Sequence, residues 1–239
     1  MVTILDIDLD FFVTPIKYWG TSNNRIPEGE ATAENIDAAM NYLETHCRLQ
    51  ARTTPGAVFE HHDELFDYAL KQFTEPIHLI HLDAHADIGG GLTKCWDYVC
   101  TKYTHLDQHM RKFPKRGNEG LNCGNFLVFL AGVGLLERVT FVSHSDWRDD
   151  YNPIYMKDFD PTSEELQLKR FSAQIIKDDD LCTPLYDLPH EVEQSIPFVR
   201  VPRHDFYSDI VPDKIILTRS PGYTPASADS LFNAISQRI

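Results

Sequence analysis

The chain has 239 residues, of which 42% are hydrophobic, and its formal net charge is -14 at pH 7. This length and composition suffice for one sizeable core, so we expect a single domain that spans residues 1–239. The acidic balance argues against nucleic acid as a partner and gives a cationic substrate electrostatic guidance.

The sequence gives no indication of a membrane span or of secretion. The longest apolar run, Phe126 to Leu136, is too short to cross a bilayer, and Met1-Val2-Thr3 lacks the basic start of a signal peptide. We therefore expect a cytoplasmic protein without a membrane partner, in which the five cysteines are reduced.

The first predicted strand carries three acidic residues. Asp6, Asp8 and Asp10 alternate with apolar residues between Ile4 and Phe12. Alternate residues of a strand share a face, so the three carboxylates should point the same way. Like charges at that spacing raise one another's pKa and oppose folding unless a cation neutralises them.

A loop and a helix are predicted next. The segment from Thr14 to Gly29 is rich in Pro, Gly and Asn, and a loop at the exit of a ligand-bearing strand is expected to line the pocket. Thr32 is the predicted N-cap of a helix that runs to about Arg48. The loop offers four side chains for substrate contact: Lys17, Tyr18, Trp19 and Arg25.

A histidine lies at the start of the second predicted helix. Glu60-His61-His62-Asp63-Glu64 precedes the helical pattern from Leu65 to Leu70, whose first turn is acidic. This spacing puts His62 at a junction between loop and helix, where it is a candidate nitrogen ligand. Glu60 is a candidate for the substrate pocket.

The central motif is His81-Leu82-Asp83-Ala84-His85-Ala86-Asp87. It follows the apolar run Ile77 to Ile80 and leads to Gly89, Gly90 and Gly91, a pattern typical of a buried parallel strand and its exit. Asp83, His85 and Asp87 would converge if the extended path continues past the strand. Three ionisable groups at a buried strand are costly unless something neutralises them. His81, on the face of Asp83, either orients a ligand or packs in the core.

The rest of the chain alternates predicted helices and strands. This alternation predicts a three-layer α/β fold with a mainly parallel sheet. Ligands of such folds gather outside the carboxyl ends of strands, so His144 and Asp146 are candidates for the pocket. The predicted elements are a helix from Phe126 to about Gly132, strands at Arg138 to Ser143, Gln167 to Phe171, Pro197 to Val201 and Lys214 to Thr218, and a last helix capped by Ser227.

Two other segments are interpreted as surface. His105 and His109 are four residues apart on a predicted helix, but a third ligand is not near them in the sequence. The stretch from Asp149 to Lys169 is charged and contains proline, as exposed excursions do.

The charges of the candidate ligands indicate the kind of metal site. The carboxylates of Asp8, Asp10, Asp83 and Asp87 balance two divalent cations, and His62 and His85 offer one nitrogen to each. Oxygen-rich sites with one imidazole per metal suit Mn²⁺, and paired metals roughly 3.5–4 Å apart hold a bridging hydroxide that attacks carbon. A structural zinc site would require sulfur-rich ligation. The cysteines form no Cys-x-x-Cys pair, which argues against such a site.

These motifs resemble those of the ureohydrolase superfamily, which includes arginase, agmatinase and formiminoglutamase. Asp83-Ala84-His85-Ala86-Asp87 is similar to its Asp-Ala-His-x-Asp signature, Asp8-Leu9-Asp10 to its Asp-x-Asp motif, and His62 to its lone upstream histidine. In more detail the chain resembles a small permuted branch with a late Ser-Pro-Gly-Tyr, here Ser220 to Tyr223. Some members of that branch are peptide arginases, which turn arginine side chains of ribosomal peptides into ornithine.

The chain departs from the ordinary ureohydrolase pattern in three respects. The Asp-x-Asp motif opens the chain instead of closing it, which a circular permutation explains. Its register is open between Asp6/Asp8 and Asp8/Asp10, and we favour the second. Where arginases place Asn-x-His-Gly, with a histidine that shuttles protons, this chain has Asn122-Cys123-Gly124-Asn125.

The resemblance implies hydrolysis of a guanidinium C–N bond in a peptide arginine, with ornithine and urea as products and two Mn²⁺ per chain as cofactors. The ligands would be Asp8, Asp10, His62, Asp83, His85 and Asp87, with Asp6 and His81 as supporting or alternative ligands. Asp10 or Asp87 would transfer the proton. The substrate-pocket candidates are Glu60, Asn122, Asn125, His144, Asp146, Ser220 and Tyr223.

Two alternatives to a peptide arginase remain open from the sequence. A mononuclear zinc deacetylase of related fold needs only an Asp/His/Asp set and would leave His62 and Asp87 without a metal. A metal-dependent binding protein that has lost turnover is the other, and the missing shuttle histidine supports it.

Overall fold

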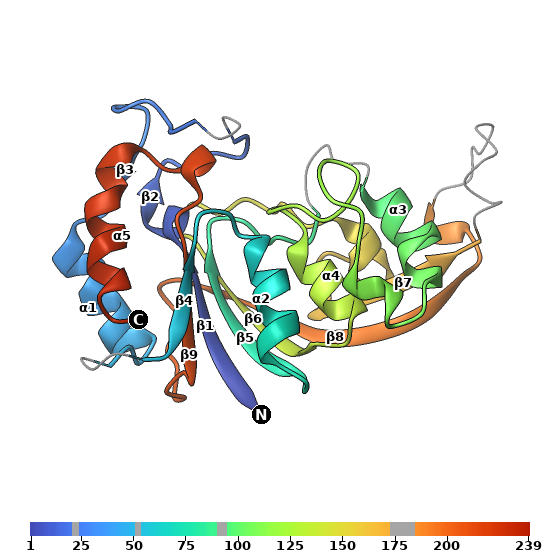
Figure 1. The fold of residues 1–239 in the computed structure, drawn as a ribbon. Helices are drawn as coiled ribbons and strands as arrows, with labels where there is room; N and C mark the ends of the chain where they lie inside the picture. Colours follow the sequence, from blue (N-terminus) through green and yellow to red (C-terminus); the bar gives the residue numbers. More distant parts are fainter. Residues whose placement is uncertain (21–23, 51–53, 90–94, 173–184) are drawn as a thin grey trace.

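The computed structural model describes residues 1–20, 24–50, 54–89, 95–172 and 185–239. A seven-stranded sheet in the order β4-β9-β1-β5-β6-β8-β7 forms its centre (Figure 1). Neighbouring strands are parallel throughout, except that β7 runs antiparallel to β8. The strands are β1 Val2–Asp8, β4 Gly56–Phe59, β5 Ile77–Asp83, β6 Leu136–Ser143, β7 Glu165–Phe171, β8 His190–Pro202 and β9 Lys214–Thr218. The predicted α/β class with a mainly parallel sheet is confirmed.

Helices cover both faces of the sheet (Figure 1). Leu5 and Ile7 of β1 pack with α1 and α5, whereas Ile4 and Leu79 pack with α2 and α4 on the other face. Side chains that alternate along one central strand therefore belong to two separate cores. The helices are α1 Ile36–His46, α2 Glu64–Gln72, α3 Cys95–Thr101, α4 Phe126–Gly132 and α5 Asp229–Ser236.

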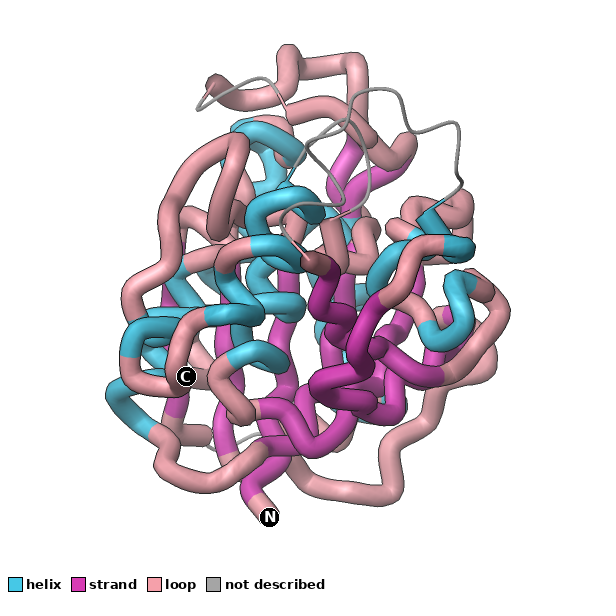
Figure 2. Tube along the Cα trace, turned by 90° about the vertical axis from the view of Figure 1, so that its right-hand side faces the viewer, coloured by secondary structure: helices cyan, strands magenta, loops and turns pink. Residues whose placement is uncertain are grey.

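Loops gather at the carboxyl ends of the strands. The view in Figure 2 shows the strands rising from the end that bears the N-terminus and the loops covering the opposite end. A short antiparallel pair belongs to this end, formed by β2 Val13–Thr14 and β3 Thr32–Ala33. None of the helices in the described ranges has the length and apolar character that crossing a bilayer requires.

Most predicted elements are confirmed, and local capping explains two differences. Thr32 lies in β3, and α1 begins later because the Asn35 side chain accepts the backbone N–H groups of Asp37 (2.9 Å) and Ala38 (3.3 Å). Ser227 lies in a 3₁₀ turn, and the N-cap of α5 is Ala228. The short strand β4 was not predicted.

The two segments that the sequence analysis interpreted as surface differ more strongly from the structure. His105 and His109 do not share an α-helix: the chain forms separate 3₁₀ turns, Tyr103–His105 and Met110–Lys112, tied together where the Arg111 guanidinium donates to the carbonyl of Leu106 (2.9 Å). Lys169 is fully buried in β7, and its Nζ donates to the carbonyl of Ile154 (3.0 Å). Gly90, Gly91 and Cys182 lie outside the described residues.

The core under α2 and α4 gives the first prediction. Phe129 is fully buried and its ring contacts those of Phe66, Tyr98 and Tyr103. Phe129→Ala should lower the free energy of unfolding by about 3–5 kcal/mol, because it removes a buried ring and leaves a cavity. Urea denaturation measures the loss. The control is Phe113→Ala, whose ring is 68% exposed and whose effect should stay within about 0.5 kcal/mol. Equal effects of the two substitutions would contradict this packing.

Candidate metal centre

The centre is built where two neighbouring parallel strands end. Asp6 of β1 pairs with His81 of β5, so Asp8 and Asp83 end their strands side by side. The chain does not continue extended beyond them, as the sequence had suggested. After Asp8 it winds into the 3₁₀ helix η1, Leu9–Phe12, because the Asp8 carboxylate accepts the backbone N–H of Asp10 (3.1 Å).

A similar turn follows Asp83. Its Oδ1 accepts the backbone N–H of His85 (2.7 Å), and Asp87 takes a left-handed conformation with φ of 48°. Aspartate tolerates that conformation better than most residues. The two turns fold Asp10, His85 and Asp87 back over the strand ends, so the predicted convergence occurs by a route other than an extended strand.

The first ligand group surrounds His62, which lies in the loop before α2. Its Nδ1 atom is 3.0 Å from Asp8 Oδ2, 3.1 Å from Asp83 Oδ2 and 3.0 Å from Asp87 Oδ2. All four side chains are buried. One imidazole nitrogen and three carboxylate oxygens thus face a common point.

The second ligand group surrounds His85. Its Nδ1 atom is 3.0 Å from Asp10 Oδ2 and 3.5 Å from Asp83 Oδ1. Asp83 therefore turns one oxygen towards each histidine and belongs to both groups. A carboxylate in that position can bridge two cations.

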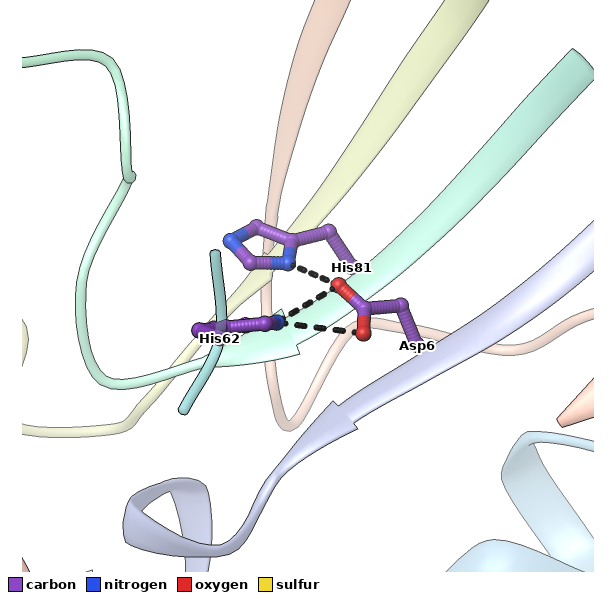
Figure 3. A group of neighbouring side chains, drawn as sticks. All are labelled: Asp6, His62 and His81. Atoms are coloured by element: carbon purple, nitrogen blue, oxygen red, sulfur yellow. Dashed lines mark hydrogen bonds and ion pairs between the residues drawn. The ribbon is translucent and has the colours of Figure 1, made fainter. Parts of the chain in front are cut away.

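Asp6 contacts the His62 ring through Nε2, the nitrogen that does not face the first group, and His81 in turn contacts Asp6 (Figure 3). The Nε2 atom of His62 is 3.1 and 3.0 Å from the two Asp6 oxygens, and Asp6 Oδ2 is 2.8 Å from His81 Nδ1. Because an ionised carboxylate can only accept, Nε2 carries a proton, and a neutral ring then keeps the lone pair of Nδ1 free for a cation. His85 is held in the same way, since its Nε2 donates to the carbonyl of Lys17 (3.0 Å). Burial lowers the pKa of His62, but the carboxylates of Asp6, Asp8 and Asp83 outweigh burial and raise it well above its ordinary value.

The unpaired atoms of the first group fit a cation. His62 Nδ1 and Asp83 Oδ2 are buried, and neither has a hydrogen-bond partner among the described residues. A nitrogen lone pair that faces three carboxylate oxygens is repelled by them, whereas a cation between these atoms attracts all four. The oxygen-rich set with one imidazole suits Mn²⁺. Asp6, His62 and His81 are also close enough to hold a metal, but their mutual hydrogen bonds already occupy the atoms that would bind it.

The electrostatics of the centre also require compensation. Burial, followed by repulsion from Asp8 and Asp83, raises the pKa of Asp10 well above its ordinary value. Burial and then the charge of Asp83 raise the pKa of Asp87 to about 7. The pKa of Asp6 is lowered despite burial, because His62 and His81 contact its carboxylate. Asp6 thus has its own partners, whereas the pKa values of Asp10 and Asp87 are raised in part by neighbouring carboxylates.

A cavity of about 460 Å³ opens onto both groups. Ser220 and Tyr223 line it, as expected for pocket residues, and the Ser220 hydroxyl donates to Asp8 Oδ2. Of the four loop candidates, Tyr18 and Trp19 line it, whereas Lys17 pairs with Glu30 and Arg25 with Asp229. The lining is Asp8, Asp10, Tyr18, Trp19, His62, Asp83, His85, Asp87, Cys123, Gly124, Arg148, Asp149, Asp150, Ser220 and Tyr223.

Five other expected pocket residues lie outside this lining. Glu60 pairs with Arg219 (3.0 Å), and Asp146 is exposed to solvent. His144 is buried, where its Nδ1 accepts the backbone N–H of Asp146 (3.0 Å). Asn122 and Asn125 build the turn that carries Cys123 and Gly124 into the cavity: Asn122 Oδ1 accepts the N–H of Gly124 (3.0 Å), and Asn125 Oδ1 accepts the N–H of Asn122 (2.8 Å).

Five lining residues were not anticipated from the sequence as pocket residues. They come from two loops, one with Cys123 and Gly124 and the other with Arg148, Asp149 and Asp150. Asp150 is anchored to the central motif, because its Oδ2 accepts the backbone N–H of Ala86 (3.2 Å). We expected pocket residues just after the carboxyl end of β6, at His144 and Asp146. The residues that reach the cavity come from the same loop, but a few positions later.

Comparison with known proteins gives no independent identification. No protein-family model matches the chain, and no curated protein matches it either. The geometry of the centre therefore carries the functional argument.

The two ligand groups predict the metal content. Protein purified without chelators and incubated with Mn²⁺ should hold two equivalents per chain, because the four negative charges of the carboxylates balance two divalent cations. Elemental analysis and calorimetric titration measure the number. A single tightly bound zinc, without further uptake of manganese, would contradict two sites and favour the deacetylase alternative.

The position of Asp6 behind His62 predicts the register of the first motif. Asp8→Ala and Asp10→Ala should each release metal, whereas Asp6→Asn keeps an oxygen for His62 Nε2 and should weaken binding at most about 10- to 100-fold. Metal titration of the three variants tests this, with the exposed Asp146→Ala as control. Loss of metal from Asp6→Asn together with retention in Asp10→Ala would reverse the assignment.

Proposed function

We propose that this chain is a two-metal hydrolase of the ureohydrolase type, which converts arginine in a peptide to ornithine with release of urea. The observation that carries the proposal is the pair of imidazole and carboxylate groups that share Asp83 at the ends of two adjacent strands. Asp8, Asp83, Asp87 and His62 would hold one cation, and Asp10, Asp83 and His85 the other.

Two divalent cations in such a site supply a nucleophile from water near neutral pH and stabilise the charge that develops on the substrate. The chain's own residues do the rest. Asp6 and the Lys17 carbonyl orient the two imidazoles, and Ser220 orients Asp8. Asp10 and Asp87 belong to the ligand groups and also line the cavity, where either could carry a proton to the leaving amine.

The walls of the cavity suit a planar cation. The rings of Tyr18 and Tyr223 pack edge to face against His85, with centroids at 5.7 and 5.0 Å, and Trp19 lines the same cavity with 66% of its surface exposed. Aromatic rings and carboxylates together attract a guanidinium group, which is planar and weakly hydrated. The exposed Trp19 gives room for a chain that extends out of the cavity.

The topology supports the permuted form of the three-layer arginase and deacetylase fold. The first and last strands of the chain, β1 and β9, are neighbours in the sheet. A permutation requires that the original ends lie near one another, as they commonly do in compact domains. This arrangement is compatible with an Asp-x-Asp motif moved to the start of the chain.

A binding protein without turnover is the second candidate, and one observation favours it. Cys123 lines the cavity in the segment where the resemblance would place a proton-shuttling histidine. Burial raises the pKa of its thiol to about 12, so the thiol stays protonated and accepts no proton at neutral pH. The zinc deacetylase is less well supported, because it leaves His62 and Asp87 without a role.

The proposal predicts a defined mass change. Manganese-loaded protein incubated with arginine-containing peptides should remove about 42 Da per arginine, the CN₂H₂ unit lost in hydrolysis to urea at a two-metal site. Free arginine and agmatine should react much more slowly than the peptides. Mass spectrometry and a urea assay measure the two products. Asp10→Ala should be inactive and Asp146→Ala unaffected.

Two outcomes would contradict the proposal. If varied arginine peptides stay unchanged but an acetylated lysine or polyamine is hydrolysed, the chain is a deacetylase. If such peptides bind in a metal-dependent manner without any release of urea, the chain is a binding protein.

A further inference from the structure

Arg148 introduces a positive charge into a cavity that is otherwise acidic. It lines the cavity and is exposed to solvent. Two cations in the ligand groups would balance Asp8, Asp10, Asp83 and Asp87, which leaves Asp149, Asp150 and Arg148 as the remaining charged side chains of the described lining. Asp150 is committed to the N–H groups of Ala86 (3.2 Å) and Trp147 (2.8 Å).

The guanidinium of Arg148 has no protein carboxylate as a partner within the described ranges. Seven of the eleven arginines in the described ranges pair with a carboxylate, and of the other four only Arg148 lines the cavity. The pairs are Arg25 with Asp229, Arg111 with Glu193, Arg116 with Asp67, Arg170 with Glu193, Arg203 with Glu34, Arg219 with Glu60 and Arg238 with Glu44. Arg148 is thus available to a ligand.

The backbone that carries Arg148 is fixed relative to the candidate metal centre. Its N–H donates to the hydroxyl of Tyr18 (2.7 Å), and the Tyr18 ring packs against His85. The residues around Arg148 are also held in place. The Arg200 guanidinium lies over the Trp147 ring, 4.3 Å from its centre, and the Asp150 carboxylate accepts a hydrogen bond from the N–H of Ala86. Arg148 therefore belongs to an anchored loop, and Tyr18 connects the backbone of this loop to the candidate metal ligand His85.

We propose that Arg148 binds a carboxylate of the substrate, so that the preferred substrate carries an acidic group close to the arginine that reacts. This inference rests on the proposed function for the reacting group. A guanidinium binds a carboxylate through two parallel hydrogen bonds, which fixes its direction as well as its charge. The carboxylate comes either from the C-terminus of the substrate arginine or from an acidic neighbouring side chain.

Matched peptides test the preference and identify its source. One pair is N-acetylated and ends in arginine, with a free carboxylate or with an amide. The second pair consists of amidated peptides in which glutamate or glutamine precedes the arginine. On manganese-loaded wild-type protein, the acidic member of at least one pair should have a kcat/KM about 10- to 100-fold higher, mainly through KM. The pair that shows the difference identifies the source.

Substitutions assign the preference to Arg148. Arg148→Gln should abolish the difference between the acidic and the neutral member of that pair while changing the neutral peptides by less than about twofold. Arg148→Lys should retain part of the difference because the charge remains. Arg138→Gln is the matched control, because this substitution removes the same charge from an exposed position on β6 outside the cavity lining. Equal losses in Arg148→Gln and Arg138→Gln, or equal losses for the acidic and the neutral peptide, would overturn the inference.

Calorimetric binding of the same peptides separates this inference from the proposed hydrolysis. If the acidic peptide binds preferentially through Arg148 but no ornithine forms, the proposed hydrolysis is contradicted and the carboxylate site is supported. Formation of ornithine at equal rates from the acidic and the neutral member of both pairs would support the hydrolysis and overturn the carboxylate site.

Discussion

The mutual repulsion of buried carboxylates is the constraint on which this structure depends. Asp8, Asp10, Asp83 and Asp87 meet at the ends of two adjacent strands, and each is at most 7% exposed. Removing such charges from water is costly, and like charges at close range increase the cost. Bound cations would reduce both penalties. The proposed metal centre would therefore explain why this sequence folds with these residues inside.

Asp6 positions a proposed metal ligand and is not one itself. It lies on the same face of β1 as Asp8 but deeper in the sheet, where His62 and His81 satisfy its carboxylate. That pairing turns the other nitrogen of His62 towards the remaining acids. Replacing Asp6 would therefore disturb the ring that faces the proposed cation site, although Asp6 itself lies outside the two proposed ligand groups.

The sequence could predict the sheet and the composition of the centre because both follow from periodicity and charge. Apolar runs marked β1, β5, β6 and β9, and alternating acids marked the strand ends. The path of the chain beyond those ends could not be predicted in the same way. Asp10 and Asp87 reach the centre through turns, which depend on side-chain to backbone bonds such as that from the Asp10 N–H to Asp8. The pocket was harder to predict, because distant residues anchor the two loops that reach it: Tyr18 accepts the N–H of Arg148, and the Gly124 carbonyl accepts the N–H of Gly89.

Anomalous diffraction from manganese-loaded crystals tests the central claim most directly. The account predicts two manganese peaks roughly 3.5–4 Å apart, one next to His62 Nδ1 and one next to His85 Nδ1, with an oxygen of Asp83 beside each. A single peak next to His85, or a peak among Asp6, His62 Nε2 and His81, would contradict the two-metal centre.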